Sequence, residues 1–141
     1  MMNDFRFDEL VIGFERKELY RITPEIYEKF IQISGDVNPL HVDQDHAERN
    51  SFPSVVMHGG ILHGFLSHFV GMILPGKNAI LLSCEIRYSK PNFLLDEIEL
   101  AARVSERAEE HQIVNLDFTF RNLTQAYVGA RARVQVGVLK A

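Results

Sequence analysis

Between residues 58 and 76 the chain reads HGGILHGFLSHFVGMILPG, its longest predominantly apolar stretch, and this stretch decides the expected fold. On a helix over 59–74, apolar side chains cover most of the circumference, as they do in helices that lie inside a protein core. Pro75-Gly76 then ends the helix. The sequence therefore predicts a buried central helix, whose apolar surface is formed by Leu62, Phe65, Leu66, Phe69 and Ile73.

The segments after this helix have the pattern of strands. We expect strands over 79–88, 97–106, 111–121 and 126–139. Polar and apolar residues alternate clearly in 114–120 and 128–136, which is typical of a sheet with one buried face. Long consecutive strands after one buried helix predict a single α+β domain over 1–141, in which an antiparallel sheet wraps around the central helix.

The segment before the central helix is predicted to contain a strand, two helices and an ordered loop. Residues 10–23 have strand character, and Thr23 can cap the helix that follows. Because Pro39 disfavours a helical residue before it, this helix should end near 34–35. We therefore expect 36–41 to be a loop, after which Asp43 caps a short second helix.

Composition narrows the possible functions. The 141 residues carry a formal net charge of −4, so a nucleic-acid partner is not expected. The apolar stretch is too short, and too interrupted by histidines, to span a membrane. One cysteine, Cys84, excludes an intrachain disulfide and fits a reducing compartment. The N-terminus has no basic region followed by an apolar one, so we expect a cytoplasmic protein without a secretion signal.

The predicted loop carries the residues suited to chemistry. Its sequence is Ser34-Gly35-Asp36-Val37-Asn38-Pro39-Leu40-His41. Asp36 and His41 supply a carboxylate and an imidazole five residues apart, the pair that acid–base chemistry on a small molecule requires. A turn residue is the alternative for Asp36 alone, but the spacing to Asn38 and His41 favours a catalytic role.

This motif resembles the signature of the MaoC-like, (R)-specific enoyl-CoA hydratases, which have the hot-dog fold. The resemblance spans about residues 20–138 and continues through Phe52, His58-Gly59, Ser67, Leu74-Pro75-Gly76-Lys77, Pro91 and Asp96-Glu97. It implies a hydro-lyase that adds water reversibly to a trans-2-enoyl thioester and forms a 3-hydroxyacyl thioester. It also implies that Asp36 and His41 hold the water. No cofactor is expected.

The resemblance and helix physics assign a third role to Gly59. Hydration builds charge on the thioester oxygen, and a fixed donor at that oxygen lowers the barrier. The Gly59 N–H stands at the start of the central helix, where a backbone donor has no helical partner and the helix dipole is positive. Glycine also leaves room for the thioester to come close. We expect Gly59 to be the oxyanion donor.

Four further residues are expected to support the site or bind substrate. Asn38 either hydrogen-bonds the water or braces the turn before proline. Ser67 matches a family position that steadies the catalytic Asp and borders the acyl pocket, although a lone helical serine usually bonds its own backbone. His58 is expected to position the loop rather than titrate. Relatives carry a larger residue at the position of Gly60, which belongs to a stripe of small residues. This stripe, Gly60, Gly64, Ser67 and Gly71, predicts either a close approach by a sheet, a helix or a ligand, or simply tight packing.

Several departures from the family pattern put acyl-chain length and pocket shape in doubt. Besides Gly60, they are Pro53-Ser54-Val55, His63 and Leu95. A metal site is not expected. His63 and His68 are five residues apart, which places them about 140° apart around the helix, and no zinc-binding spacing or phosphate loop occurs.

Two other functions remain open. A hot-dog acyl thioesterase is the nearer alternative, but many such enzymes carry an acidic residue on the central helix, and this chain has no Asp or Glu from Ser51 through Cys84. The other alternative is a non-catalytic acyl-CoA-binding subunit, which would not need both Asp36 and His41. The two groups together favour the hydratase.

The partners follow from the resemblance. An acyl-CoA or acyl-carrier-protein thioester is the expected substrate, and a homodimer is the expected assembly. The long strand over 126–139 could supply a shared edge between two copies. The carrier's phosphates have three candidate cationic partners in Arg87, Lys90 and Arg103.

Overall fold

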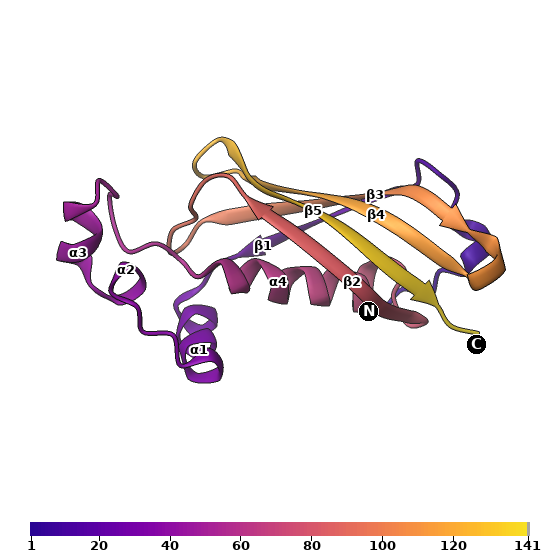
Figure 1. Ribbon diagram of the computed structural model, residues 1–141, viewed down its shortest axis with the longest axis horizontal. Helices are drawn as coiled ribbons and strands as arrows, with labels where there is room; N and C mark the ends of the chain where they lie inside the picture. The colour runs from indigo at the N-terminus through magenta and orange to yellow at the C-terminus, as the bar shows by residue number, and fades with distance from the viewer. Residues whose placement is uncertain (141) are drawn as a thin grey trace.

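An antiparallel five-stranded sheet curves around one helix in the computed structural model, which describes residues 1–140 (Figure 1). The strands are β1 (Glu15–Arg21), β2 (Ala79–Tyr88), β3 (Glu97–Ala108), β4 (Ile113–Asn122) and β5 (Tyr127–Val138). Their order across the sheet is β1-β3-β4-β5-β2. The predicted α+β hot-dog architecture is confirmed, while Ala141, the last residue of the predicted domain, lies outside the described residues.

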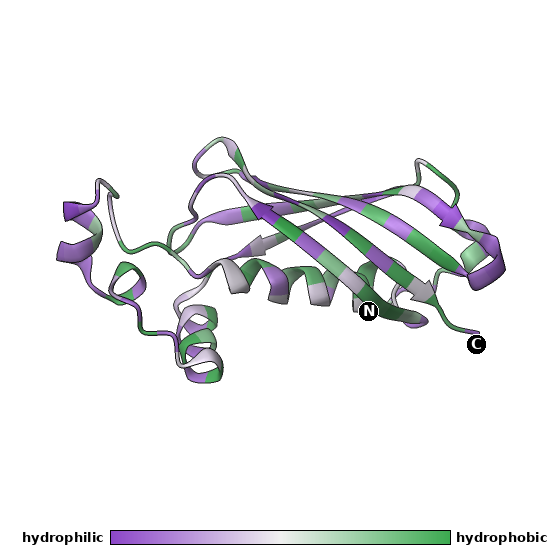
Figure 2. Cartoon of the chain, viewed as in Figure 1, coloured by the Kyte–Doolittle hydropathy of each residue, from purple (hydrophilic) through white to green (hydrophobic). Residues whose placement is uncertain are grey.

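The core lies between α4 (Gly59–His68) and the inner face of the sheet. Residues of β3, β4 and β5 alternate between buried and less buried positions, so each strand gives one apolar row to the core and one polar row to the outer face (Figure 2). The helix contributes Ile61, Leu62, Phe65 and Leu66 to the same core. Burial of these rows is the main force that holds helix and sheet together.

The central helix changes its winding near the end of the predicted span. After His68 it continues as a π-helical turn over Phe69–Ile73, closed by the bond from the Leu74 N–H to the Phe69 carbonyl at 2.9 Å. The wider turn carries Phe69 and Val70 into the core. The predicted extent of 59–74 is therefore close to the observed one. Among the described residues, no helix is long and apolar enough to cross a membrane.

Three more helices lie at one end of the sheet: α1 (Pro24–Ser34), α2 (Pro39–Val42) and α3 (Gln44–Arg49). Of these, α2 and α3 project beyond that end (Figure 1). The predicted caps are confirmed, because Thr23 accepts the Ile26 N–H at 3.2 Å and Asp43 accepts the His46 N–H at 3.2 Å. One expectation was wrong: His41 lies in α2, not in a loop. Pro39 starts this helix, since its fixed φ suits the first helical position.

Two strand expectations also need correction. Residues 10–13 form a turn instead of a strand, because Gly13 takes a φ of 93° and donates its N–H to the Val104 carbonyl at 2.8 Å. The strand over 126–139 was a candidate for a shared edge between two copies. It corresponds to β5, which lies between β4 and β2, so its backbone is paired on both sides. The edge strands are β1 and β2.

Candidate active site

The turn after α1 orients the carboxylate of Asp36. Gly35 ends the helix with a φ of 67°, a left-handed conformation that glycine adopts without steric cost. The Asp36 N–H then donates to Ser34 Oγ at 3.1 Å, and Asp36 Oδ1 accepts the Asn38 N–H at 3.1 Å. This Asx turn occupies one carboxylate oxygen and leaves Oδ2 facing His41.

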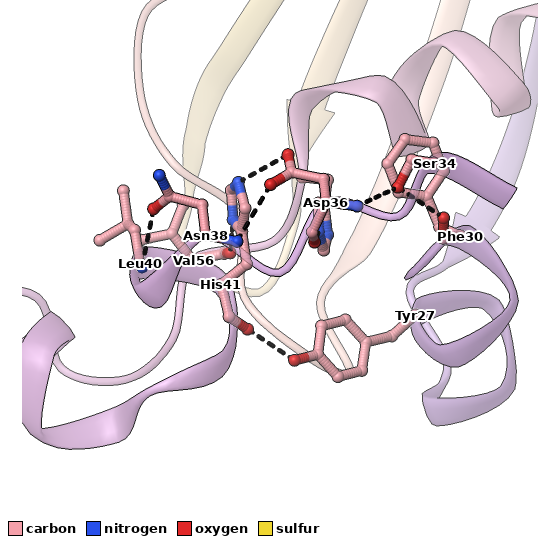
Figure 3. Close-up of polar contacts among 9 residues, drawn as sticks. Tyr27, Phe30, Ser34, Asp36, Asn38, Leu40, His41 and Val56 are labelled. Atoms are coloured by element: carbon pink, nitrogen blue, oxygen red, sulfur yellow. Dashed lines mark hydrogen bonds and ion pairs between the residues drawn. The ribbon is translucent and has the colours of Figure 1, made fainter. Parts of the chain in front are cut away.

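The short helix α2 presents the imidazole of His41 to this carboxylate (Figure 3). Asn38 caps α2 by accepting the Leu40 N–H at 3.0 Å, which supports the bracing role rather than contact with water. His41 Nδ1 lies 2.6 Å from the Val56 carbonyl oxygen. A carbonyl can only accept, so Nδ1 carries the hydrogen and Nε2 faces Asp36 Oδ2 at 3.6 Å.

The space between Asp36 and His41 suits a small donor. A separation of 3.6 Å is too long for a direct hydrogen bond. In the neutral tautomer of His41, both Nε2 and the carboxylate oxygen are acceptors, so they attract a molecule that donates to both. The side chain of His41 is 16% exposed and that of Asp36 is 47% exposed, so one group is shielded and the other reaches solvent.

A tyrosine on α1 also anchors α2, through a hydrogen bond to the backbone of His41. The hydroxyl of Tyr27 donates to the His41 carbonyl at 2.5 Å (Figure 3). Partial burial raises the pKa of Tyr27 above its ordinary value, so the hydroxyl keeps its proton at neutral pH and remains a donor. Sequence reasoning missed Tyr27, because a tyrosine on an amphipathic helix gives no signal beyond its apolar character.

Gly59 stands at the start of α4, beside His41. Both residues line a cavity of about 480 Å³, together with Phe52, Val56, Met57, Tyr88, Ser89, Lys90, Pro91 and Asn92. The ring of Tyr88 leans over Gly59, where a Cβ would lie 3.0 Å from Tyr88 Cε1. The side chain of His58 makes no capping bond among the described residues, so the first N–H groups of the helix stay available.

A second hollow runs along α4. This groove, about 780 Å³ in volume and mostly apolar, runs between α1, α4 and β1 and is lined by Gly60, Phe30 and Ser67 among others. Ser67 is eight residues beyond Gly59, or ~12 Å along the helix axis at 1.5 Å per residue. Within one chain Ser67 thus borders the groove, as expected of an acyl pocket, but does not steady Asp36.

The small-residue stripe, which runs from α4 into the π-helical turn, has one close neighbour in the described chain. A Cβ on Gly60 would lie 2.4 Å from Phe30 Cζ, so glycine there makes room for the phenylalanine ring. At Gly64 and Gly71 a Cβ would meet no atom within 4 Å among residues 1–140. Tight packing within the chain therefore explains Gly60 but not the other two glycines.

A buried polar cluster supports the far wall of the cavity. Asp96 is 2% exposed, and its Oδ2 accepts the Phe93 N–H at 2.8 Å and Asn122 Nδ2 at 2.6 Å. Asn122 also donates to Asn92, whose carbonyl accepts the Met57 N–H at 2.9 Å. The cluster thereby ties the loop after β2 to the segment before α4. Of its members, only Asp96 had a signal, through the family resemblance.

His58 lies against both Asp36 and His41, and these three form one group of potential metal ligands among the described residues, with donor atoms within 4.8 Å of one another. The His41 and His58 rings are stacked, with centroids 3.9 Å apart. Because a nitrogen lone pair lies in its ring plane, stacked rings do not direct their nitrogens at one ion. The arrangement suits acid–base chemistry better than a metal.

Comparisons with known proteins agree with this geometry. A family model described as "MaoC like domain" matches residues 6–125. The (R)-specific enoyl-CoA hydratase of Aeromonas caviae is 34% identical over 111 residues, which cover 79% of this chain and 80% of that protein. The 3-hydroxybutyryl-CoA dehydratase of Methylorubrum extorquens is 27% identical over 130 residues, which cover 92% of this chain and 83% of that protein.

Solved structures show the same fold. The unliganded (R)-hydratase of Pseudomonas aeruginosa superposes with a TM-score of 0.90 at 21% identity, covering 99% of this chain and 89% of that one. Because the family model matches more than half of the chain, and a relative above 30% identity covers most of it, the assignment does not rest on fold alone. The protein belongs to the MaoC-like domain family.

Proposed function

We propose that the protein is an (R)-specific enoyl-CoA hydratase, a hydro-lyase that adds water reversibly to a trans-2-enoyl thioester and yields a 3-hydroxyacyl thioester. The observation that carries the proposal is the pair of acceptors, Asp36 Oδ2 and His41 Nε2, 3.6 Å apart beside the start of α4. The names of the relatives support the same reaction.

The pair would hold the reacting water. Water donates one hydrogen to the carboxylate and one to Nε2, which directs an oxygen lone pair at C3 of the enoyl group. As the C3–O bond forms, a proton passes from the water to the Asp36–His41 pair, and the pair delivers a proton to C2. The pair therefore ends in its starting protonation state, and the reverse sequence removes water.

Gly59 would stabilise the charge that builds on the thioester oxygen during this step. Its N–H is a preorganised donor at the positive end of the α4 dipole. With the thioester at Gly59, the acyl chain is assigned to the apolar groove that begins at Gly60 and passes Ser67. The carrier arm is assigned to the cavity wall with Lys90, whereas Arg87 and Arg103 line hollows on the sheet beyond this site.

A homodimer is the proposed assembly. The edge strand β2 carries three exposed apolar residues, Ile80, Leu81 and Leu82, and the small-residue face with Gly64 of α4 and Gly71 of the π-helical turn is open. An exposed apolar edge beside an uncovered small-residue helix face favours a second copy. Sedimentation equilibrium should give twice the chain mass of 16.2 kDa, and Leu82→Lys should shift the equilibrium toward monomer. A wild-type monomer at micromolar concentration would contradict this assembly.

A cytoplasmic location is the proposal that fits the lone thiol of Cys84, which is free and partly buried. Free thiols persist in reducing compartments. Fractionation of cells that express the tagged chain tests it, and recovery in an oxidising compartment would count against it.

The activity is tested with crotonyl-CoA and its longer homologues, by following the loss of enoyl absorbance. We expect hydration by the wild type and a rate at least ~100-fold lower for Asp36→Asn, the low end for an acid–base group. The control is His111→Gln, an exposed histidine in the turn between β3 and β4, at the far end of the sheet from α2 (Figure 1). This control should keep the wild-type rate.

The same samples separate the alternatives. Release of free CoA thiol without loss of the enoyl group would indicate a thioesterase. Tight binding of the thioester without turnover would indicate a binding subunit. Chiral analysis of the 3-hydroxyacyl product checks the stereochemistry, and an (S)-product would contradict the proposed specificity.

A further inference from the structure

One side chain contacts both members of the Asp36–His41 pair. His58 Nε2 lies 2.8 Å from the Asp36 carbonyl oxygen, so it donates its hydrogen to that carbonyl. The ring of His58 also stacks on the ring of His41, with an interplanar angle of 27° and centroids 3.9 Å apart. His58 thus fixes the backbone of one group and the ring plane of the other.

The position of His58 is itself fixed from two sides. It is 3% exposed, and it directly precedes the first residue of α4. The ring of Phe30 packs against it with centroids 5.0 Å apart, and the ring of Tyr27 lies with its centroid 6.0 Å away. A side chain held this firmly can transmit the rigidity of the core to the turn and to α2.

The second ring nitrogen of His58, Nδ1, makes no hydrogen bond within the described residues. Because Nε2 carries the hydrogen, Nδ1 is an acceptor, and it is buried without a hydrogen-bond partner among the described residues. Buried polar atoms are normally paired, so such an atom destabilises the fold. A phenylalanine would keep a ring at this place without an unpaired nitrogen, but it is larger and could not donate to the Asp36 carbonyl.

We propose that His58 is a positioning residue for the hydration reaction, which holds Asp36 and His41 in the relative orientation that grips the water. This inference rests on the proposed function. Small misplacements of reacting groups lower turnover strongly while they affect ground-state binding much less. His58 is therefore expected to act on kcat rather than on KM, although it touches neither the water nor the thioester.

Two variants separate the hydrogen bond of His58 from its ring stacking. His58→Phe keeps a stacked ring and loses the donor, whereas His58→Gln keeps an N–H donor and loses the ring. We expect kcat to fall at least ~10-fold in His58→Phe, with KM within about threefold of the wild type. His58→Gln should recover part of kcat. The melting temperature of His58→Phe should stay close to that of the wild type, because loss of the unpaired Nδ1 offsets the strain of the larger ring. His111→Gln serves as the matched control.

A readout without substrate separates this proposal from the proposed function. In ¹⁵N-resolved NMR spectra, wild-type His41 should give sharp ring signals of the Nδ1–H tautomer, and the two His58 variants should broaden these signals as the ring loosens. Wild-type kcat in both variants, a change in KM alone, or equally sharp His41 ring signals in both variants would overturn the positioning role. If His58→Phe does not fold, His58→Gln decides by the same criteria. A wild type inactive on every enoyl thioester would instead overturn the hydratase.

Discussion

His41 Nδ1 donates its hydrogen to the Val56 carbonyl at 2.6 Å, and this bond determines what the imidazole can do. It leaves Nε2 as the ring nitrogen that faces Asp36, and it links α2 to the segment just before α4. A main-chain acceptor cannot change its protonation state at neutral pH. The tautomer of His41 is therefore set by the fold rather than by the substrate.

His41→Gln is expected to lower the hydration rate at least ~100-fold, because an amide cannot exchange a proton with water. The change should leave substrate affinity largely intact, since the thioester contacts are assigned to Gly59. Steady-state kinetics with crotonyl-CoA measure kcat and KM separately. Near-normal kcat in this variant would remove His41 from the catalytic pair.

Gly59→Ala is expected to reduce activity more than stability. The added Cβ would lie 3.0 Å from Cε1 of Tyr88, an exposed residue whose ring can shift at the cost of its 3.3 Å bond from the hydroxyl to the Gly59 carbonyl. Folding should therefore change by less than about 1 kcal/mol. The methyl group would, however, occupy the space where the thioester approaches, so kcat/KM should fall at least ~10-fold, less than for loss of an oxyanion donor. Chemical unfolding and kinetics on one preparation check both parts, and unchanged kcat/KM would argue against a thioester at Gly59.

The fold could be predicted because its determinants are local and repetitive. The apolar surface of 59–74, the alternation in the later strands and the caps at Thr23 and Asp43 each act over a few residues. Asp36 and His41 could be paired for the same reason, since five residues and one proline separate them. The structure brings them within 3.6 Å, while their catalytic role stays a prediction.

What escaped prediction depends on partners distant in sequence. The order of the strands places β5 inside the sheet, although its own residues equally suit an edge. Gly60 is needed because the ring of Phe30 packs against it. The wall of the cavity is held by the hydrogen bond between Asn122 and Asn92, which are 30 residues apart in the sequence. No pattern within a single element reveals such contacts, because they arise only when separate elements pack together.

Gly60→Ala is expected to destabilise the protein despite the better helix propensity of alanine. The new Cβ would lie 2.4 Å from Phe30 Cζ, and overpacking of this kind costs about 1–3 kcal/mol, against a propensity gain of at most ~1 kcal/mol. Phe30→Leu should relieve the clash, so the double variant should lose less stability than the two single variants added together. A double-mutant cycle of unfolding free energies measures this coupling, and strict additivity would contradict the contact.

Asp96→Ala is expected to lower the free energy of unfolding by about 3 kcal/mol, because it removes the acceptor of two buried donors. These donors are the Phe93 N–H and the side-chain amide of Asn122, and Asp96 also accepts from the amide of the exposed Gln125. Asp96→Asn should cost less, since its remaining oxygen can still accept two of them. Guanidinium unfolding followed by circular dichroism ranks the variants, and equal stability of Asp96→Ala and wild type would contradict the role of the cluster.

Stability should decline above about pH 10, and Tyr20 should contribute most to the decline. Burial raises the pKa of Tyr20 strongly, with a smaller contribution from the charge of Glu18, while its hydroxyl lies 2.8 Å from His68 Nδ1. A tyrosine in the unfolded chain releases its proton near pH 10, whereas folded Tyr20 retains it. The unfolded state therefore binds fewer protons at higher pH, and the free energy of unfolding falls with pH in that range.

Tyr20→Phe removes this contribution, so its free energy of unfolding should fall less steeply between pH 9 and 11 than that of the wild type. Tyr88→Phe is the matched comparison, because Tyr88 is more exposed and its pKa is raised less strongly by burial. Denaturant titrations at three pH values in this window give the slopes. If the free energy of unfolding fell equally steeply with pH in the wild type and in Tyr20→Phe, Tyr20 would release its proton as easily in the folded protein as in the unfolded chain. That result would contradict the packing of Tyr20 against Phe65 and His68.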